Sequence, residues 1–255
     1  MKGQSIKLGI SVGDLNGIGG EVILKTLEDS RMLDFCTPVI FASAKTISFL
    51  LKHFNLDINF QGVKSADKAI HGKINVVNVW NDNPHIKFGE ETPEGGSYAI
   101  QSLSAAVDAL KKDQVDVLIT APINKANIQA EDFKFPGHTD FLNQELAGNS
   151  LMFMVSEKLK VGLLTDHVPV KNISEKITAE LITQKFKTIH HSLVQDFGIR
   201  KPKIAFLGIN PHVGDHGVIG KEDDEVLIPT LESLRDKGHL CYGPYAADSF
   251  FGSGN

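Results

Sequence analysis

Short apolar runs alternate along the chain with longer stretches in which apolar residues recur at helical spacing. Runs at residues 6–12, 38–42 and 74–79 are short and apolar, which is typical of buried strands. Between and after them, residues 45–54 and 94–111 carry apolar side chains three or four positions apart, which predicts amphipathic helices. Strands that alternate with helices indicate an α/β fold with a largely parallel sheet.

The second half of the chain continues this alternation with one exception. Residues 115–120 are apolar and β-branched, which predicts a central strand. The runs 151–155 and 159–164 are separated by three polar residues, and this short connection favours an antiparallel hairpin. Four further elements complete the prediction: a long helix over 178–197, a strand over 204–207, a helix over 221–237 and a short strand near Leu240. The helix over 221–237 has acidic residues first and basic residues last, which suits the helix dipole. We therefore expect mixed sheets.

Composition narrows the classes of function. The 255 residues are 42% hydrophobic and 22% charged, as expected of a globular domain or two, and the net charge of −5 argues against nucleic acid or an anionic membrane as a partner. No uncharged apolar run approaches 18 residues, so we predict no membrane span. Two cysteines in no metal-ligand spacing favour a reducing cytoplasm. Because no element closes the chain after Phe250, we also expect it to be a fragment.

Two polar turns follow predicted strands and are candidates for ligand binding. The loop 13–20 is glycine-rich and precedes a helix, but it fits neither a P-loop nor the dinucleotide fingerprint, since Val22 stands where a third glycine belongs. It is either a tight turn or a site in which Asp14 and Asn16 take part. In the turn 120–125, Asn124 either caps a helix or contacts a ligand.

Histidines in polar turns are the candidates for chemistry. His167 and His212 each follow a predicted strand by a few residues and lie beside a proline, so two imidazoles are available to a divalent ion. Hydrogen bonding to loop backbone explains them equally well, and a third ligand has to come from His138, His216, a carboxylate or outside the chain. His138 precedes a predicted helix start at Thr139 or Asp140, where an anion is favoured.

Six short motifs occur together in a fixed order. They are SVGDLNGIG at 11–19, TAPINK at 120–125, GHTDF at 137–141, DHVP at 166–169, GINPHVG at 208–214 and GPYAAD at 243–248. In this order they make the chain resemble the 4-hydroxythreonine-4-phosphate dehydrogenase family of pyridoxal 5′-phosphate biosynthesis over its whole length.

The resemblance implies a two-domain fold like that of isocitrate and isopropylmalate dehydrogenases, with the active cleft between the domains. Residues 1–125 would form the first α/β domain, normally completed by a C-terminal segment that this chain lacks. Residues 126–255 would form the second, with the metal ligands and dimer contacts. The implied reaction is NAD-dependent oxidation and decarboxylation of 4-phosphohydroxy-L-threonine to 3-amino-2-oxopropyl phosphate.

The resemblance also implies roles for single residues. His167 and His212 would bind a divalent metal (zinc, magnesium or cobalt), His138 and Thr139 the substrate, and Asp248 would act in catalysis. Residues that bind NAD are not assigned. The family's third metal histidine and several substrate contacts lie beyond residue 255, and its site is shared by two subunits of a homodimer. A dehydrogenase of phosphorylated threonate or erythronate, a metal-dependent hydrolase and a non-catalytic phosphate-binding domain remain alternatives.

Overall fold

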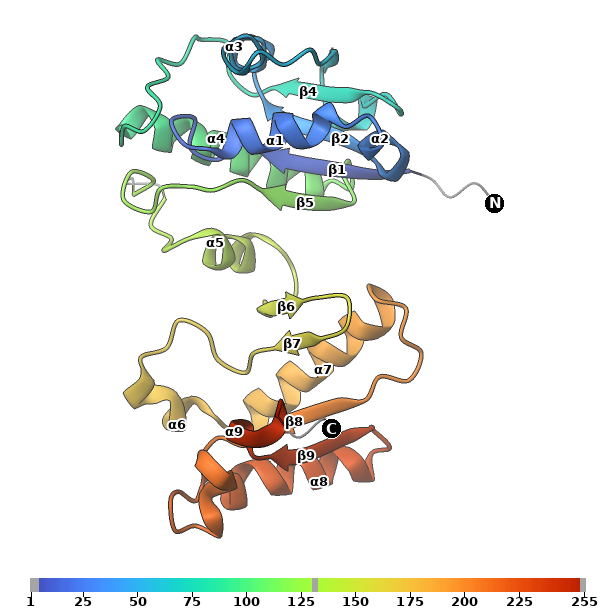
Figure 1. The fold of residues 1–255 in the computed structure, drawn as a ribbon, viewed down its shortest axis with the longest axis vertical. Helices are drawn as coiled ribbons and strands as arrows, with labels where there is room; N and C mark the ends of the chain where they lie inside the picture. Colours follow the sequence, from blue (N-terminus) through green and yellow to red (C-terminus); the bar gives the residue numbers. More distant parts are fainter. Residues whose placement is uncertain (1–4, 130–132, 253–255) are drawn as a thin grey trace. The chain divides into compact units, whose positions relative to one another are not determined.

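The computed structural model describes residues 5–129 and 133–252, and the chain divides into two compact units, Met1–Gly148 and Asn149–Asn255 (Figure 1). The first unit holds a parallel five-stranded sheet with helices. The second holds an antiparallel strand pair and a parallel strand pair. The predicted α/β class with mixed sheets is confirmed.

The elements of the first unit follow the predicted alternation, with one further strand at Phe60–Val63 that the sequence analysis did not predict. In chain order they are β1 (Ile6–Ser11), α1 (Gly19–Glu28), α2 (Met32–Phe35), β2 (Cys36–Ala42), α3 (Ala44–Phe54), β3 (Phe60–Val63), the 3-10 turn η1 (Ala66–Lys68), β4 (Ile74–Asn78), α4 (Pro93–Lys111), β5 (Val117–Thr120) and α5 (His138–Glu145).

The second unit has shorter strands and more irregular turns. Its elements are β6 (Phe153–Val155), β7 (Lys160–Gly162), η2 (Val170–Asn172), α6 (Ile173–Lys176), α7 (Ala179–Gln195), β8 (Ile204–Leu207), η3 (Pro211–Asp215), the π-helical turn η4 (Asp223–Leu227), α8 (Ile228–Asp236), β9 (Cys241–Tyr245) and α9 (Ala247–Phe250).

Strand β2 shows why the first unit forms a layered core. All seven of its residues are buried, and neighbouring side chains point to opposite faces of the sheet. Ile40 and Ala42 belong to the apolar cluster that includes side chains of α1 and α3, whereas Val39 and Phe41 belong to a cluster with α4. The sheet is therefore covered on both faces at β2, which is why this strand has no exposed residue.

Side chains that precede the helices fix where three of them begin. Ser43, Thr92 and Thr178 each accept a hydrogen bond from the backbone N–H three residues later, at 3.1, 3.1 and 3.2 Å. Such caps satisfy an N–H group that has no partner within the helix. Helix α3 ends at Asn55, whose left-handed backbone (φ 55°) is a common helix stop.

The prediction that residues 115–120 form a central strand does not hold for the sheet that the described residues form. The order of the sheet is β3-β4-β2-β1-β5, so β5 lies at an edge, paired with β1 and with no other strand of the described residues. Val117 and Ile119 are 42% and 49% exposed. β-Branched, apolar composition reports strand propensity, but it does not report how many neighbours a strand has.

The division between the units also differs from the predicted boundary at residue 125. The described residues between 126 and 148 belong to the first unit, because Ile128, Phe133 and Phe141 share a buried cluster with Ala99 and Leu103 of α4. The sequence placed this segment with the motifs that follow it. Its phenylalanines instead complete the core under α4.

No helix in the described parts of the chain is long and apolar enough to cross a membrane.

Phe141 lies in the buried cluster under α4 and should contribute strongly to the stability of the first unit. Its side chain is 7% exposed and its ring lies 5.1 Å from that of Phe133, so Phe141→Ala should lower the free energy of unfolding by about 3–5 kcal/mol. Phe35, which is 73% exposed, is the matched control, and Phe35→Ala should change it by less than about 0.5 kcal/mol. Equal losses in chemical denaturation would contradict the packing of α5 on this unit.

Candidate active site

In the first unit, the carboxyl ends of β1 and β5 meet at the topological switch point of the sheet. The chain leaves β1 for β2 on one side, and β5 pairs with β1 on the other. Ligands of open parallel sheets bind in the crevice at such a point. A pocket of about 470 Å³ lies there, lined by Asp14, Asn16, Gly17, Ile18, Gly89, Glu90, Glu91, Pro122, Ile123 and Asn124.

The glycine-rich loop after β1 is held by buried polar contacts. The Asp14 carboxylate accepts hydrogen bonds from the Asn16 backbone N–H (2.9 Å) and from the Asn127 side-chain amide (2.8 Å). Gly13 has φ 67°, and a Cβ on it would lie 2.1 Å from the Pro122 carbonyl oxygen, so a larger residue does not fit. The loop is thus a tight turn, and Asp14 and Asn16 also line the pocket.

Asn16 ties this loop to the long connection that precedes α4. Its side-chain amide donates to the Glu90 carbonyl (3.1 Å) and the Thr92 hydroxyl (2.8 Å), and its side-chain oxygen accepts from the Lys87 backbone N–H (2.8 Å). In the turn after β5, Asn124 accepts from the Ala126 N–H (2.9 Å) and donates to Glu91 (2.7 Å). Asn124 therefore stabilises its turn and also lines the pocket.

Helix α5 begins at His138, earlier than the start at Thr139 or Asp140 that the sequence predicted, so His138 is its first residue and Thr139 follows it. Gly137 at the N-cap has no side chain to accept the first N–H groups, which leaves them available to an anion. The Nε2 atom of His138 is buried without a hydrogen-bond partner in the described part of the chain, and burial lowers the pKa of its imidazole. At neutral pH the ring is therefore mainly uncharged.

In the second unit, the structure brings two of the predicted residues together. Nδ1 of His212 lies 3.2 Å from the Asp248 carboxylate, and the two side chains remain 66% and 47% exposed. His212 follows β8 and Asp248 follows β9, and these strands pair in parallel. Both side chains are thus placed at one edge of the strand pair, in solvent-accessible positions where a substrate can reach them.

The turn that carries His212 has an unusual backbone. Every residue from His212 to His216 has a positive φ, between 45° and 76°, and only Gly214 among them is a glycine. Residues other than glycine rarely adopt this conformation, and each costs roughly 1–3 kcal/mol that surrounding contacts must offset. His167 shares the feature, with φ 51°, in an exposed bend after β7.

Two neighbouring carboxylates hold the start of the His212 turn. Asp223 is fully buried and accepts from the backbone N–H groups of Ile209 (2.8 Å) and Asn210 (2.9 Å). Glu222 accepts from the Ser174 hydroxyl (2.5 Å) and the Asn210 side-chain amide (2.8 Å). These hydrogen bonds, that of Ser174 first, lower the pKa of Glu222 to about 2.

The described residues supply part of a metal site. His212, Asp248 and His167 offer the imidazole and carboxylate donors that divalent transition metals take, but no group of three histidine, cysteine, aspartate or glutamate side chains among the described residues is placed to hold an ion. Structural and catalytic zinc sites use at least three protein ligands. A complete ligand set is therefore not formed by residues 5–129 and 133–252.

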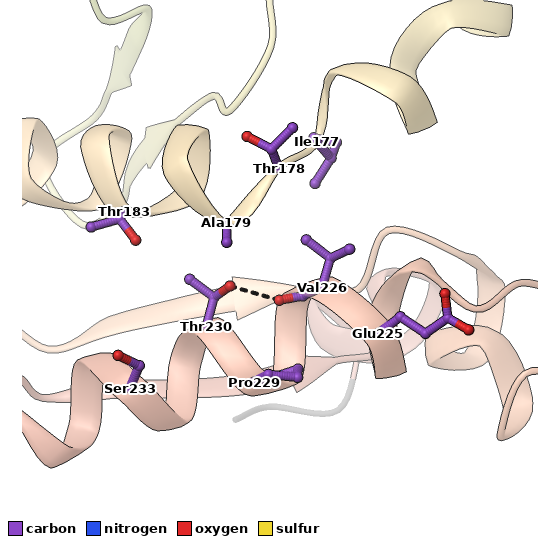
Figure 2. Close-up of a pocket in the computed structure, with 9 residues that line it drawn as sticks. All are labelled: Ile177, Thr178, Ala179, Thr183, Glu225, Val226, Pro229, Thr230 and Ser233. Atoms are coloured by element: carbon purple, nitrogen blue, oxygen red, sulfur yellow. Dashed lines mark hydrogen bonds between the residues drawn. The ribbon is translucent and has the colours of Figure 1, made fainter.

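A separate pocket of about 410 Å³ lies between the start of α7 and the η4–α8 segment (Figure 2). Figure 2 shows Thr178, Ala179 and Thr183 on one side and Val226, Pro229 and Thr230 on the other, with Glu225 at one end. None of the predicted site residues lines this pocket. We therefore place the candidate active site at the strand ends and not here.

Asp223, Glu222 and Asn127 are site-supporting residues that the sequence interpretation missed. The acidic residues at 222–225 were interpreted as charges that suit a helix dipole, whereas Asp223 faces inward. Nothing in the local sequence distinguishes Asp223 from the acidic residues beside it. Asn127 lies outside all six motifs, and nothing in its local sequence indicates that it contacts Asp14.

Glu222 should give the stability of the protein an acid-sensitive component. Because its pKa is about 2 in the folded protein and ordinarily 4.5, its stabilisation is fully present above pH 4.5 and is lost as pH falls through 2. Glu222→Gln should therefore be less stable than wild type at pH 7, and the difference should shrink below pH 4.5 in urea titrations. A pH-independent difference, or the same behaviour in the control Glu225→Gln, would contradict this assignment.

Comparison with known proteins places these residues in a family. Residues 34–255 match the family model described as pyridoxal phosphate biosynthetic protein PdxA. The chain is 44% identical over 257 residues to a 4-hydroxythreonine-4-phosphate dehydrogenase of Bacteroides thetaiotaomicron, covering 100% of this chain and 71% of that protein. It is 35% identical over 250 residues to the protein of the same name from a Sulfurihydrogenibium species, covering 96% and 76%.

A solved structure agrees with these matches. The crystal structure of a 4-hydroxythreonine-4-phosphate dehydrogenase from Burkholderia phymatum superposes with a TM-score of 0.83 at 28% identity, over 97% of this chain and 76% of that one. The family model covers most of the chain, and the fold and ordered motifs agree with it. The chain belongs to the PdxA family of pyridoxal phosphate biosynthetic proteins.

Proposed function

We propose that the protein oxidises and decarboxylates 4-phosphohydroxy-L-threonine to 3-amino-2-oxopropyl phosphate, with NAD as hydride acceptor, in pyridoxal 5′-phosphate biosynthesis. The family and the names of its two relatives support the dehydrogenase class and this substrate. The single observation that carries the proposal is the contact of 3.2 Å between His212 and Asp248 at the ends of two parallel strands.

The chemistry has two steps. The carbon that bears the free hydroxyl gives a hydride to the nicotinamide, and the hydroxyl proton passes to a base. The product is a ketone β to the carboxylate. As carbon dioxide leaves, the electron pair of the broken C–C bond forms an enolate with the ketone, and a proton added at the amino-bearing carbon gives 3-amino-2-oxopropyl phosphate. Asp248 serves as the base, since its carboxylate is accessible and is placed by its contact with His212.

His138 and Thr139 hold the anionic part of the substrate. Because burial lowers the pKa of His138, the ring contributes a hydrogen bond and not a full positive charge. The uncapped first turn of α5 adds backbone N–H groups and the positive end of the helix dipole. The imidazole and the backbone N–H groups together suit a phosphate or carboxylate, because such an anion accepts several hydrogen bonds.

His167 and His212 take part in binding a divalent ion, with zinc, magnesium and cobalt as the candidates. Since the described residues do not form a complete ligand set, further ligands must come from elsewhere. When bound, such an ion supplies Lewis-acid stabilisation of negative charge on the substrate. Metal affinity measured by titration of the apoprotein tests this, and undiminished binding by a variant with both His167→Ala and His212→Ala would contradict it.

NAD binds at the switch-point pocket of the first unit. Its location supports this assignment, because dinucleotides occupy the corresponding crevice in other open α/β sheets. Asp14, Glu90 and Glu91 line the pocket, and their charge opposes the extra phosphate of NADP in addition to the pyrophosphate that both cofactors carry, so NAD ranks above NADP. A lower KM for NADP than for NAD would contradict this preference.

The protein acts as a cytoplasmic homodimer in this proposal. Apolar side chains on the β6–β7 hairpin support self-association, since Met154, Val155 and Leu159 are 47–53% exposed. Two free, buried cysteines are compatible with a reducing compartment. Sedimentation that gives the mass of one chain, or recovery of the protein outside the cytoplasmic fraction of cells, would contradict these points.

The direct test of the function is NADH absorbance after addition of 4-phosphohydroxy-L-threonine, NAD and a divalent metal. We expect absorbance to rise with this substrate and to rise more slowly with phosphorylated threonate. Faster turnover of phosphorylated threonate or erythronate would reassign the substrate. Product release without NAD would instead support a hydrolase.

Asp248→Asn should lower kcat by about 10²–10⁴-fold, because the amide cannot accept the hydroxyl proton. Substrate KM should change little, since binding groups elsewhere are retained. Asp236→Asn, at the end of α8, removes an equal charge at an exposed position and should keep wild-type kcat. Comparable kcat values for the two variants would exclude Asp248 as the base.

A further inference from the structure

We propose that Asp223 is a positioning residue for His212. In this view its carboxylate fixes the start of the 208–216 loop, and the loop in turn holds the His212 imidazole beside Asp248. The kinetic part of the inference rests on the function proposed above, whereas the structural part does not. Asp223 belongs to none of the six motifs found in the sequence.

The contacts of Asp223 all lead to this loop. Its Oδ1 accepts the Ile209 backbone N–H at 2.8 Å, and its Oδ2 accepts the Asn210 backbone N–H at 2.9 Å and side-chain amide at 3.1 Å. The residue is 0% exposed. Burying a carboxylate costs free energy unless hydrogen-bond donors surround it. These three donors therefore explain how the Asp223 carboxylate can be buried.

Asp223 has no charged partner that could explain its burial in another way. Among the described residues, no lysine, arginine or histidine lies within ion-pair distance of it. Its negative charge is therefore compensated by N–H dipoles of the loop. The dependence is mutual, because these N–H groups would lack a partner if the carboxylate were removed.

The loop needs such an anchor because its own conformation is unfavourable. Its residues from His212 to His216 all have a positive φ. Immediately before them, the Asn210 amide donates to Glu222 (2.8 Å) as well as to Asp223, so two consecutive carboxylates hold one side chain. Gly220 permits this arrangement, since a Cβ there would lie 2.6 Å from the Asn210 amide.

Asp223 begins the π-helical turn η4, and its neighbours on that turn have different surroundings. Glu225 and Val226 line the separate pocket drawn in Figure 2, and Asp224 is exposed. Asp223 alone among the aspartates of this turn is buried and bonded to the His212 loop. Asp224→Asn is consequently a matched control that removes the same charge one residue away.

The test compares Asp223→Asn with Asp224→Asn in the full chain. An asparagine has one side-chain oxygen, so its NH₂ group must face at least one of the loop's N–H donors. We expect amide hydrogen exchange at Ile209 and Asn210 to accelerate at least tenfold in Asp223→Asn alone. We also expect kcat to fall by about 10–100-fold with KM within about threefold of wild type, as for misplacement of a reacting group.

A spectroscopic readout separates positioning from a general loss of stability. In protein labelled with ¹⁵N-histidine, the His212 ring signal, assigned by its disappearance in His212→Gln, should shift in Asp223→Asn and stay in place in Asp224→Asn. Wild-type kcat and an unshifted His212 signal in a folded Asp223→Asn protein would overturn the inference. If the wild type shows no dehydrogenase activity, the proposed function fails, and the exchange and ring signals alone decide the role of Asp223.

A second variant covers the case in which Asp223→Asn does not fold. Asn210→Ala removes one of the three donors and leaves Asp223 in place. It should lower kcat and shift the His212 signal in the same direction, by less. If kcat and the His212 signal of Asn210→Ala both matched those of wild type, the inference would be overturned.

Discussion

Parallel pairing of β8 with β9 is the interaction on which the candidate active site of the second unit depends. The Gly208 N–H donates to the Tyr245 carbonyl at 2.8 Å, and the register shifts between Ala205 and Leu207. Irregular register of this kind redirects the chain as it leaves a sheet. Because both strands end at the same edge, His212 and Asp248 meet at 3.2 Å although 36 positions separate their numbers in the sequence.

In each unit, a buried aspartate stabilises a polar loop that lies next to the apolar core. Asp14 is 6% exposed and Asp223 is 0% exposed, and each accepts backbone N–H groups of the loop that follows a strand. Leaving such groups buried without partners would cost about 1–3 kcal/mol each. The loops are thereby fixed before a ligand arrives, which reduces the entropy lost on binding.

Most of the elements could be predicted because their hydrophobic period is strong. The apolar runs of β1, β2 and β4 lie where the sequence indicated, and α4 and α7 begin within one residue of their predicted starts. The position of β5 in the sheet could not be predicted, because strand order depends on pairing partners and not on local propensity. The motifs located His138, His167, His212 and Asp248, but their roles remain proposals.

Asp223 and Asn127, which support the candidate site, could not be predicted for a different physical reason. Asp223 is an acidic residue near a helix start, and the sequence cannot show whether such a side chain points outward to solvent or inward to a loop. Likewise, Asn127 reaches Asp14 across 113 positions of sequence. Long-range hydrogen bonds between polar groups leave no periodic pattern, whereas apolar faces do.

Hydride transfer from substrate to cofactor is the step that defines the proposed function. The most direct measurement is NMR of the reduced cofactor formed from 4-phosphohydroxy-L-threonine that carries deuterium on the carbon bearing the free hydroxyl. We expect one deuterium on the nicotinamide ring for each molecule of carbon dioxide released. Reduced cofactor without deuterium, or carbon dioxide and phosphate released with no reduced cofactor, would contradict it.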